Sequence, residues 1–322
     1  MGERAGGAAR RRPRTGVKAG ARAAIDCGTN STRLLVADAR GGQLTRVMRI
    51  TRLGQGVDRE NRLAPEAISR TVGVLREFRR SMDGYEVERV RMVATSAVRD
   101  AVNGGTFSQA AEEAVGVAPE ILTGTEEGEL AYRGASGDLP TFAGDTLVVD
   151  IGGGSTELTL GRDGVVSSVS LQLGCVRLTE RCLTSDPPTG AEISATRTVI
   201  AAELDRGERE LGALAALRPA RRLIGLAGTI STLASLKLGL AEYDMERLHH
   251  TAIGADEVRR LCAQLAALSA RERSTLVGMV PGRADVIFGG ALVLEMVQVR
   301  YGFDEVISSE RDILDGIVLS LA

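Results

Sequence analysis

One stretch of the sequence organises the rest of the chain: Leu147-Val148-Val149-Asp150-Ile151-Gly152-Gly153-Gly154-Ser155-Thr156-Glu157-Leu158-Thr159-Leu160. An apolar run ends at Asp150, three glycines and Ser155 follow, and after Glu157 leucine alternates with threonine. Such alternation predicts a half-buried strand, so the stretch predicts a strand, a tight glycine turn and a second strand. Glycine N–H groups facing one concavity suit an anion, and carboxylates at both ends of the turn suit Mg²⁺. The stretch therefore predicts a site for Mg²⁺ and phosphate.

The same pattern occurs earlier in the chain, at an offset of 124 residues. The matching pairs are Asp26 with Asp150, Gly28 with Gly152, Ser31 with Ser155 and Thr32 with Thr156. Each copy then continues through a strand to another glycine turn. Two unrelated hairpins are the alternative, but agreement of four residue types at one offset favours an internal duplication. We therefore expect two similar halves, each with one phosphate loop, facing a common cleft.

Length and composition limit the class of protein. A chain of 322 residues that is 43% hydrophobic can form about two domains with a large core. No apolar run reaches about 18 residues, so no membrane-spanning helix is expected. Four scattered cysteines predict a reduced, cytoplasmic protein. The only histidines, His249 and His250, are adjacent, which argues against a zinc site and against a histidine-activated nucleophile.

The distribution of charge and the positions of glycine and proline divide the chain into three predicted segments. Residues 1–22 carry seven Arg or Lys against one acid and predict a disordered basic tail without the apolar core of a signal peptide. The scarcity of aromatic residues argues against specific nucleic-acid binding. A linker over residues 136–144, rich in glycine with one proline, places a boundary between a domain of residues 23–139 and one of residues 140–322. Strands alternating with helices in both predict an α/β protein.

Two common phosphate motifs are absent. The sequence contains no Gly-x-x-x-x-Gly-Lys-Ser/Thr, which excludes a P-loop, and no Gly-x-Gly-x-x-Gly after the first strand, which argues against a dinucleotide site. The phosphate loops thus belong to a different fold.

At this point the chain resembles a known family, the exopolyphosphatase/guanosine pentaphosphate phosphatase (Ppx/GppA) family, and most closely its short, two-domain actinobacterial members. The motifs that carry the resemblance are Asp26-Cys27-Gly28-Thr29-Asn30-Ser31, Thr95-Ser96-Ala97-Val98-Arg99-Asp100, Gly124-Thr125-Glu126-Glu127-Gly128, Asp150-Ile151-Gly152-Gly153-Gly154-Ser155-Thr156-Glu157 and Gly225-Leu226-Ala227-Gly228-Thr229. The resemblance implies a duplicated actin-like ATPase (ribonuclease H-like) fold, with two domains around a central cleft.

The resemblance also implies roles for particular residues. Glu127 matches the catalytic base, and Asp150 and Glu157 match ligands of Mg²⁺. Glu127 could otherwise be an acid that simply favours a helix N-terminus, and Arg99 could be a solvated charge. The phosphate contacts implied are Asp26, Gly28, Asn30, Ser31, Arg99, Gly152, Gly153, Gly154 and Ser155.

We therefore expect an exopolyphosphatase that releases terminal orthophosphate from polyphosphate by Mg²⁺-assisted attack of water. Three rivals stay open: a guanosine pentaphosphate phosphatase, a small-molecule kinase of the same fold, and a nucleotide-switched interaction protein. A long positive groove would favour polyphosphate, whereas a base-sized pocket near Gly228 would favour the nucleotide. The expected partners are one of these substrates and, as a family-based expectation, a second copy of the chain in a homodimer.

Overall fold

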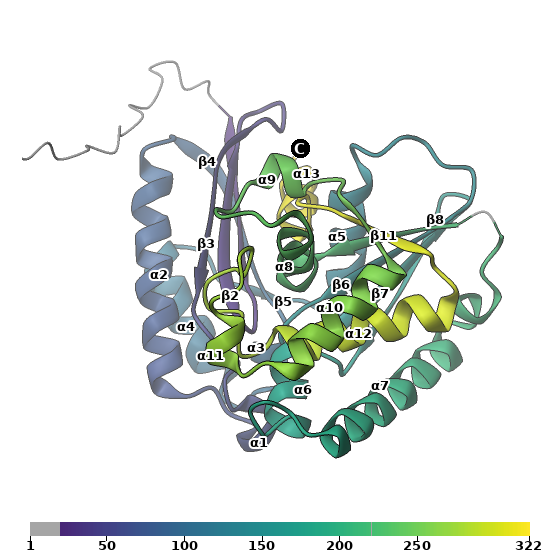
Figure 1. Ribbon diagram of the computed structural model, residues 1–322. Coiled ribbons are helices and arrows are strands. Elements are labelled where there is room, and N and C mark those ends of the chain that lie inside the picture. The colour runs from purple at the N-terminus through teal and green to yellow at the C-terminus, as the bar shows by residue number, and fades with distance from the viewer. Residues whose placement is uncertain (1–19, 220) are drawn as a thin grey trace, which may run out of the picture.

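The computed structural model describes residues 20–219 and 221–322, which form two β-sheets (Figure 1). The first sheet has the strand order β3-β2-β1-β4-β5 and the second β10-β11-β9-β6-β7-β8. The strands of the first sheet are β1 (Ala21–Cys27), β2 (Ser31–Ala37), β3 (Gln43–Ile50), β4 (Val87–Ala94) and β5 (Glu120–Ile121). Those of the second are β6 (Asp145–Ile151), β7 (Thr156–Arg162), β8 (Val165–Leu171), β9 (Arg221–Leu226), β10 (Ala252–Gly254) and β11 (Glu305–Ser308).

The second sheet repeats the first. The order β8-β7-β6-β9-β11 has the same connections as β3-β2-β1-β4-β5, and β10 is added at one edge. In both sheets the strand before the glycine turn pairs antiparallel with the next strand and parallel with a later one. The predicted fold class, a duplicated α/β fold of the actin-like ATPase type, is confirmed.

The first half begins slightly earlier than predicted. Ala21 and Arg22 belong to β1, although the sequence placed them in the basic tail. Residues 1–19, which hold the rest of that predicted tail, lie outside the described residues. The predicted boundary after residue 139 falls in the connection before β6 and stays a prediction.

Helices cover both sheets. In the first half they are α1 (Val57–Glu60), α2 (Pro65–Asp83), α3 (Ser96–Asp100), α4 (Gly104–Val115) and α5 (Gly124–Ser136). In the second they are α6 (Cys175–Cys182), α7 (Gly190–Glu210), the 3-10 helix η1 (Gly212–Ala216), α8 (Ala227–Leu238), α9 (Met245–Leu248), α10 (Ala255–Ala267), α11 (Ala270–Arg273), α12 (Ile287–Tyr301) and α13 (Ile313–Ser320).

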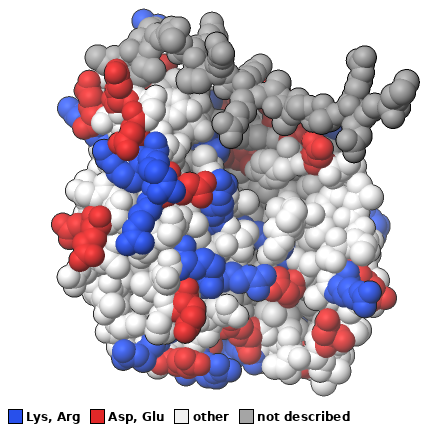
Figure 2. All heavy atoms as spheres, turned by 90° about the vertical axis from the view of Figure 1, so that its left-hand side faces the viewer, with Lys and Arg blue, Asp and Glu red and all other residues white. Residues whose placement is uncertain are grey.

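The outer layer of the first half is made by α2 and α4. Pro65 occupies the first position of α2, where no backbone N–H is needed, and Val72, Leu75 and Phe78 recur at helical spacing on its buried side. Leu75 and Phe78 pack with side chains of α4 and the first sheet into one core cluster. The outward face carries interspersed charges, such as the Arg49–Glu77 ion pair, and Figure 2 shows this mixed surface.

Two helices lie between the sheets. α5 packs on β7 and β8, whereas α13 packs on β1 and β2, and the two helices contact each other (Figure 1). Their crossing depends on glycine, because a Cβ on Gly134 would overlap the carbonyl oxygen of Asp312 and a Cβ on Gly316 would overlap that of Leu130. One core cluster joins α5, α13 and both sheets. Since α5 begins at Gly124, this layer fixes where its first turn lies.

The far face of the second sheet is covered by the largest core cluster, which draws on α6, α7, α8, α10 and α12. α8 follows β9 directly, and its first residue, Ala227, has a φ of 66°, in the left-handed region. The fold thus brings the N-termini of α5, α8 and α13 toward the space between the halves.

Candidate active site

The two glycine turns have the same geometry. Each is closed by one hydrogen bond of 3.0 Å, from the Gly28 N–H to the Ser31 carbonyl in the first and from the Gly152 N–H to the Ser155 carbonyl in the second. A Cβ built on Gly153 would lie 3.0 Å from the Thr29 Cβ, so the two turns are in contact. The duplicated loops therefore meet at one place.

The second loop is held from behind by α6. The first two N–H groups of α6 donate to the carbonyls of Gly152 and Gly153 at 3.0 and 2.9 Å. The Arg177 Nε donates to the carbonyl of Gly154 at 2.6 Å. All three glycine carbonyls are thus engaged by one helix, which fixes the loop.

The first loop is held in a similar way. The backbone N–H groups of residues 51, 52 and 54 donate to the carbonyls of Thr29 and Asn30. With the carbonyls engaged, the N–H groups of Asn30, Gly153 and Gly154 have no acceptor among residues 20–219 and 221–322. Adjacent free N–H groups are what an anion site requires.

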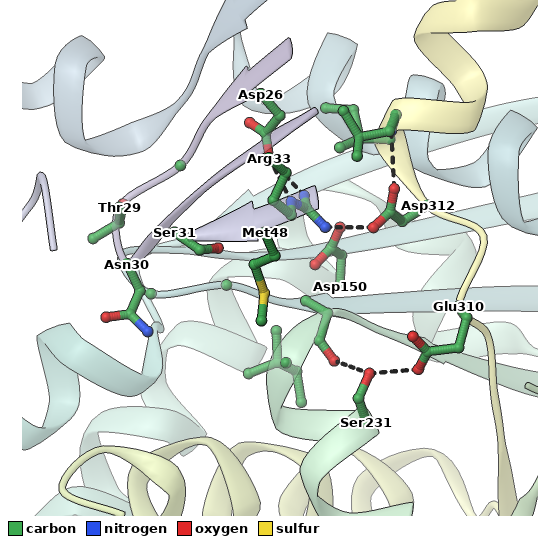
Figure 3. A pocket seen from close by; sticks show the side chains of 18 of the residues that line it. Asp26, Thr29, Asn30, Ser31, Arg33, Met48, Asp150, Ser231, Glu310 and Asp312 are labelled. Carbon is green, nitrogen blue, oxygen red and sulfur yellow. Dashed lines mark hydrogen bonds and ion pairs between the residues drawn. The ribbon is translucent and has the colours of Figure 1, made fainter. Parts of the chain in front are cut away.

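These loops open into a cleft of about 650 Å³ that is lined by both halves. Figure 3 shows Asn30 and Ser31 on one side of it and Asp150 beyond them. The predicted site residues among its lining are Asp26, Gly28, Asn30, Ser31, Glu127, Asp150, Gly152, Gly153 and Ser155. The structure therefore brings most of the predicted site together, from positions more than a hundred residues apart.

Three predicted residues lie just outside the lining. Gly154 faces Ser96, because a Cβ there would lie 2.7 Å from its hydroxyl oxygen. Glu157 is buried and accepts a hydrogen bond of 2.7 Å from the Ser170 hydroxyl. Arg99 donates to the Leu122 carbonyl at 2.8 Å, and its role in binding phosphate stays a prediction.

Glu127 lies in the first turn of α5. The helix starts with a capping box, in which the side chains of Thr123 and Glu126 each accept a hydrogen bond from the other residue's backbone N–H. Glu126 is thereby occupied at the cap, while Glu127 faces the cleft, with Arg99 Nη1 3.4 Å from its carboxylate. The two neighbouring acids thus have different environments.

Several carboxylates share this part of the cleft. Burial, followed by the charge of Glu157, raises the pKa of Asp150 to about 8. The same two causes raise the pKa of Glu127 well above its usual range, and burial raises that of Glu157. Negative groups gathered in this way repel one another until a cation joins them.

The donor set fits Mg²⁺. The residues that could hold it, Asp150, Glu157 and Asp26, offer hard carboxylate oxygens, the ligands this ion prefers. Asp26 gives independent support for a cation site, because its Oδ1 is buried without a hydrogen-bond partner among the described residues. An orphaned acceptor beside a negative cluster is suited to an ion or to water in its shell.

A known protein family matches most of this chain. The family model described as the Ppx/GppA phosphatase family matches residues 35–322. The chain belongs to this family. It is therefore a phosphatase-type hydrolase, and the resemblance seen in its motifs is confirmed.

Individual Ppx/GppA relatives are similar to this protein along nearly the whole chain. "Exopolyphosphatase 2" of Mycobacterium tuberculosis is 46% identical, covering 93% of this chain and 98% of that protein. A crystal structure of an exopolyphosphatase-like protein matches with a TM-score of 0.86 and 36% identity, over 93% of this chain and 98% of that one. The Aquifex aeolicus Ppx/GppA protein matches with a TM-score of 0.76 and 32% identity, over 94% and 97%.

The structure adds charged residues that the sequence did not single out. Arg33 donates through Nε and Nη2 to Asp26 at 2.9 and 2.5 Å, and its Nη1 pairs with Asp312 at the start of α13. Arg46 pairs with Asp312 and with Asp315. A continuous chain of alternating charges thus ties the first sheet to α13 along one wall of this Ppx/GppA cleft (Figure 3).

The sequence did contain a signal for Arg33. Adding 124 to Arg33 gives Glu157, and in both hairpins these residues face the aspartate across the strand pair, as Asp26 with Arg33 and Asp150 with Glu157. No local pattern pointed to Asp312, because its partner Arg33 lies 279 residues away.

The wall near α8 carries two further charged residues. Arg283 is buried and packs its guanidinium directly against Gly228, and its Nε has no partner among the described residues. Glu310 is also buried in the cleft lining, where its Oε1 accepts a hydrogen bond of 2.6 Å from Ser231.

One other group could suggest a metal: Asp138, His249 and His250. The two imidazole rings are stacked, with centroids 3.8 Å apart, so their in-plane lone pairs run side by side and do not converge on one ion. The His249 Nδ1 accepts the Glu310 N–H at 3.1 Å, so its Nε2 carries the proton that it donates to Asp138 at 2.6 Å. The group is a hydrogen-bonded support for Glu310.

Within the described part of the chain, no helix is long and apolar enough to cross a membrane.

Proposed function

We propose that the protein is an exopolyphosphatase that releases terminal orthophosphate from inorganic polyphosphate. The observation that carries this proposal is the meeting of two glycine loops with free N–H groups at a cleft that Glu127 also lines. Relatives named exopolyphosphatase span nearly the whole chain, which supports the same substrate class.

In this proposal the terminal phosphoryl group lies between the two loops. The N–H groups of Asn30, Gly153 and Gly154 hold its oxygens, and their placement beforehand favours the charge that develops during transfer. Asp150 and Glu157, with Asp26 in support, would hold Mg²⁺, which supplies charge neutralisation for the anhydride oxygens.

Glu127 is the proposed base. Its carboxylate accepts a proton from the water that attacks the terminal phosphorus, while the shortened chain leaves with the bridging oxygen. Burial and Glu157 raise the pKa of Glu127, which makes it a stronger base, and Arg99 opposes that shift. A general base works best when its pKa is near the pH of reaction.

Guanosine pentaphosphate is the second candidate substrate, because part of the cleft lining is apolar. These apolar side chains are Val47, Met48, Ile50, Met245, Val280 and Pro281. Such walls suit a flat organic group better than a chain of phosphates. The kinase and interaction-protein alternatives are set aside by membership in a phosphatase family.

The test is orthophosphate release with Mg²⁺ from tripolyphosphate and from guanosine pentaphosphate, each compared with the Glu127→Gln variant. Release from tripolyphosphate with the higher kcat/KM supports the proposal. A higher kcat/KM for the nucleotide favours the second candidate, and no release from either substrate overturns both.

A further inference from the structure

We propose that Glu310 limits the length of anion that the cleft accepts, so that the enzyme favours short polyphosphates over long ones. This inference rests on the proposed function. It concerns the wall of the cleft beyond the phosphate loops, where Glu310 and Ser231 lie on the other side of Asp150 from Asn30 and Ser31 (Figure 3).

The position of Glu310 is fixed from three directions. Its backbone N–H donates to His249 Nδ1 at 3.1 Å. The Ser231 hydroxyl donates to Oε1 at 2.6 Å, and the Tyr243 hydroxyl contacts Oε2. With only 8% of the residue exposed, this carboxylate cannot swing out of the path of a substrate.

The charge of Glu310 is not neutralised by an ion pair. Asp312, two residues later, is paired with both Arg33 and Arg46, but no Arg, Lys or His within residues 20–219 and 221–322 forms an ion pair with Glu310. Burial raises the pKa of Glu310, and the hydroxyls of Ser231 and Tyr243 oppose that shift. In its ionised form the carboxylate therefore presents a phosphate chain with a negative charge that no ion pair neutralises.

The same wall holds groups that would otherwise attract an anion. The first turn of α8 presents the positive end of a 12-residue helix, and Arg283 packs against Gly228 in that turn. Ser231, which belongs to the same helix, is bonded to Glu310. Glu310 thus places its carboxylate where a further phosphate would gain from α8.

The cleft lining also carries apolar side chains that offer a phosphate chain no polar partner: Val47, Met48, Ile50, Met245, Val280 and Pro281. The neighbouring Arg46 is already paired with Asp312 and Asp315. Charged oxygens lose hydration there without gaining a partner. Both features point to a substrate that is short, or whose far end leaves the cleft early.

The experiment compares kcat/KM for tripolyphosphate with that for a long-chain polyphosphate, at pH 8 and low salt. In Glu310→Gln, which keeps the shape but accepts from only one of the two hydroxyls and donates to the oxygen of the other, the long-to-short ratio should rise about tenfold, the effect of removing one like charge at close range. The matched control is Glu246→Gln, which removes an exposed acid on α9 that does not line the cleft, and should keep the wild-type ratio.

An unchanged ratio in Glu310→Gln overturns the inference. Wild-type protein gives an independent reading that needs no variant: KM per chain end should not fall as the chain grows beyond a few phosphates, and a steep fall also overturns the inference. Failure to release phosphate from any polyphosphate is a different result, because it rejects the proposed function itself.

Discussion

Glu127 and Glu126 are neighbouring acids with different surroundings, which makes them a matched pair. Glu126 is held in the capping box, whereas Glu127 lines the cleft. Glu127→Gln should lower kcat about 10²- to 10⁴-fold, the usual contribution of a general base. Glu126→Gln should stay near wild-type activity, since glutamine also completes a capping box. Orthophosphate release measures both, and near-normal turnover of Glu127→Gln would show that another group is the base.

Asp150 gives the corresponding prediction for the cation. Asp150→Asn should raise the Mg²⁺ concentration for half-maximal activity at least about tenfold, because a charged ligand becomes neutral. Asp163→Asn is the control, since Asp163 lies exposed in the turn after β7 and does not line the cleft. Titration of activity with Mg²⁺ distinguishes the two variants. The same requirement for Mg²⁺ in both would remove Asp150 from the metal site.

At the residue scale, the sequence predicted what repeats locally and missed what pairs at long range. Asp26 and Asp150 could be found because both stand before a glycine turn at one offset. Arg33 was overlooked although that offset marks it, because a cation at the position of Glu157 does not look like a repeat. Asp312 and Glu310 belong to the cleft only because the end of β11 reaches it.

At the scale of elements, the crossing of α5 and α13 is the most sensitive contact. A Cβ on Gly134 would overlap the Asp312 carbonyl, so Gly134→Ala should lower the free energy of unfolding by about 1–3 kcal/mol or more. Gly73→Ala in α2 meets no atom within 4 Å and should raise that free energy by about 0.5–1 kcal/mol. Chemical denaturation compares the two, and equal effects would show that the crossing is loose.

Elements were easier to predict than their contacts. Helix α2 can be recognised from the sequence, because its apolar side chains recur at helical spacing around one buried face. The central position of α5 and α13 was not predictable, because it depends on glycines that permit close approach. Nothing in the local pattern distinguishes such a glycine from one that is exposed, like Gly73.

For the whole molecule, the acidic cluster couples stability to pH. Burial raises the pKa of Asp150 to about 8 in the folded protein, whereas an unfolded aspartate titrates near 3.9, at about its ordinary value. Between these values the folded state keeps a proton that the unfolded chain releases. The free energy of unfolding should therefore fall as pH rises from about 4 to 8, by at most about 1.4 kcal/mol per pH unit from this group.

Denaturation with a chelator present, at pH 6 and pH 8, checks this expectation. Wild-type protein should lose more stability than Asp150→Asn over that interval, and Mg²⁺ at pH 8 should restore it by binding the ionised cluster. Glu127 and Glu157 act in the same direction. Equal losses in both proteins would mean that Asp150 is ionised at pH 6.

The register of the two hairpins makes the two glycine loops electrostatically different. Asp26 faces Arg33 and so forms a neutral couple, while Asp150 faces Glu157 and so forms a doubly acidic one. A perfectly symmetric pair of loops would grip a symmetric anion equally well from either end. The two loops therefore differ in charge, and the acidic couple of the second loop attracts a cation more strongly than the couple of the first loop, whose Asp26 is paired with Arg33.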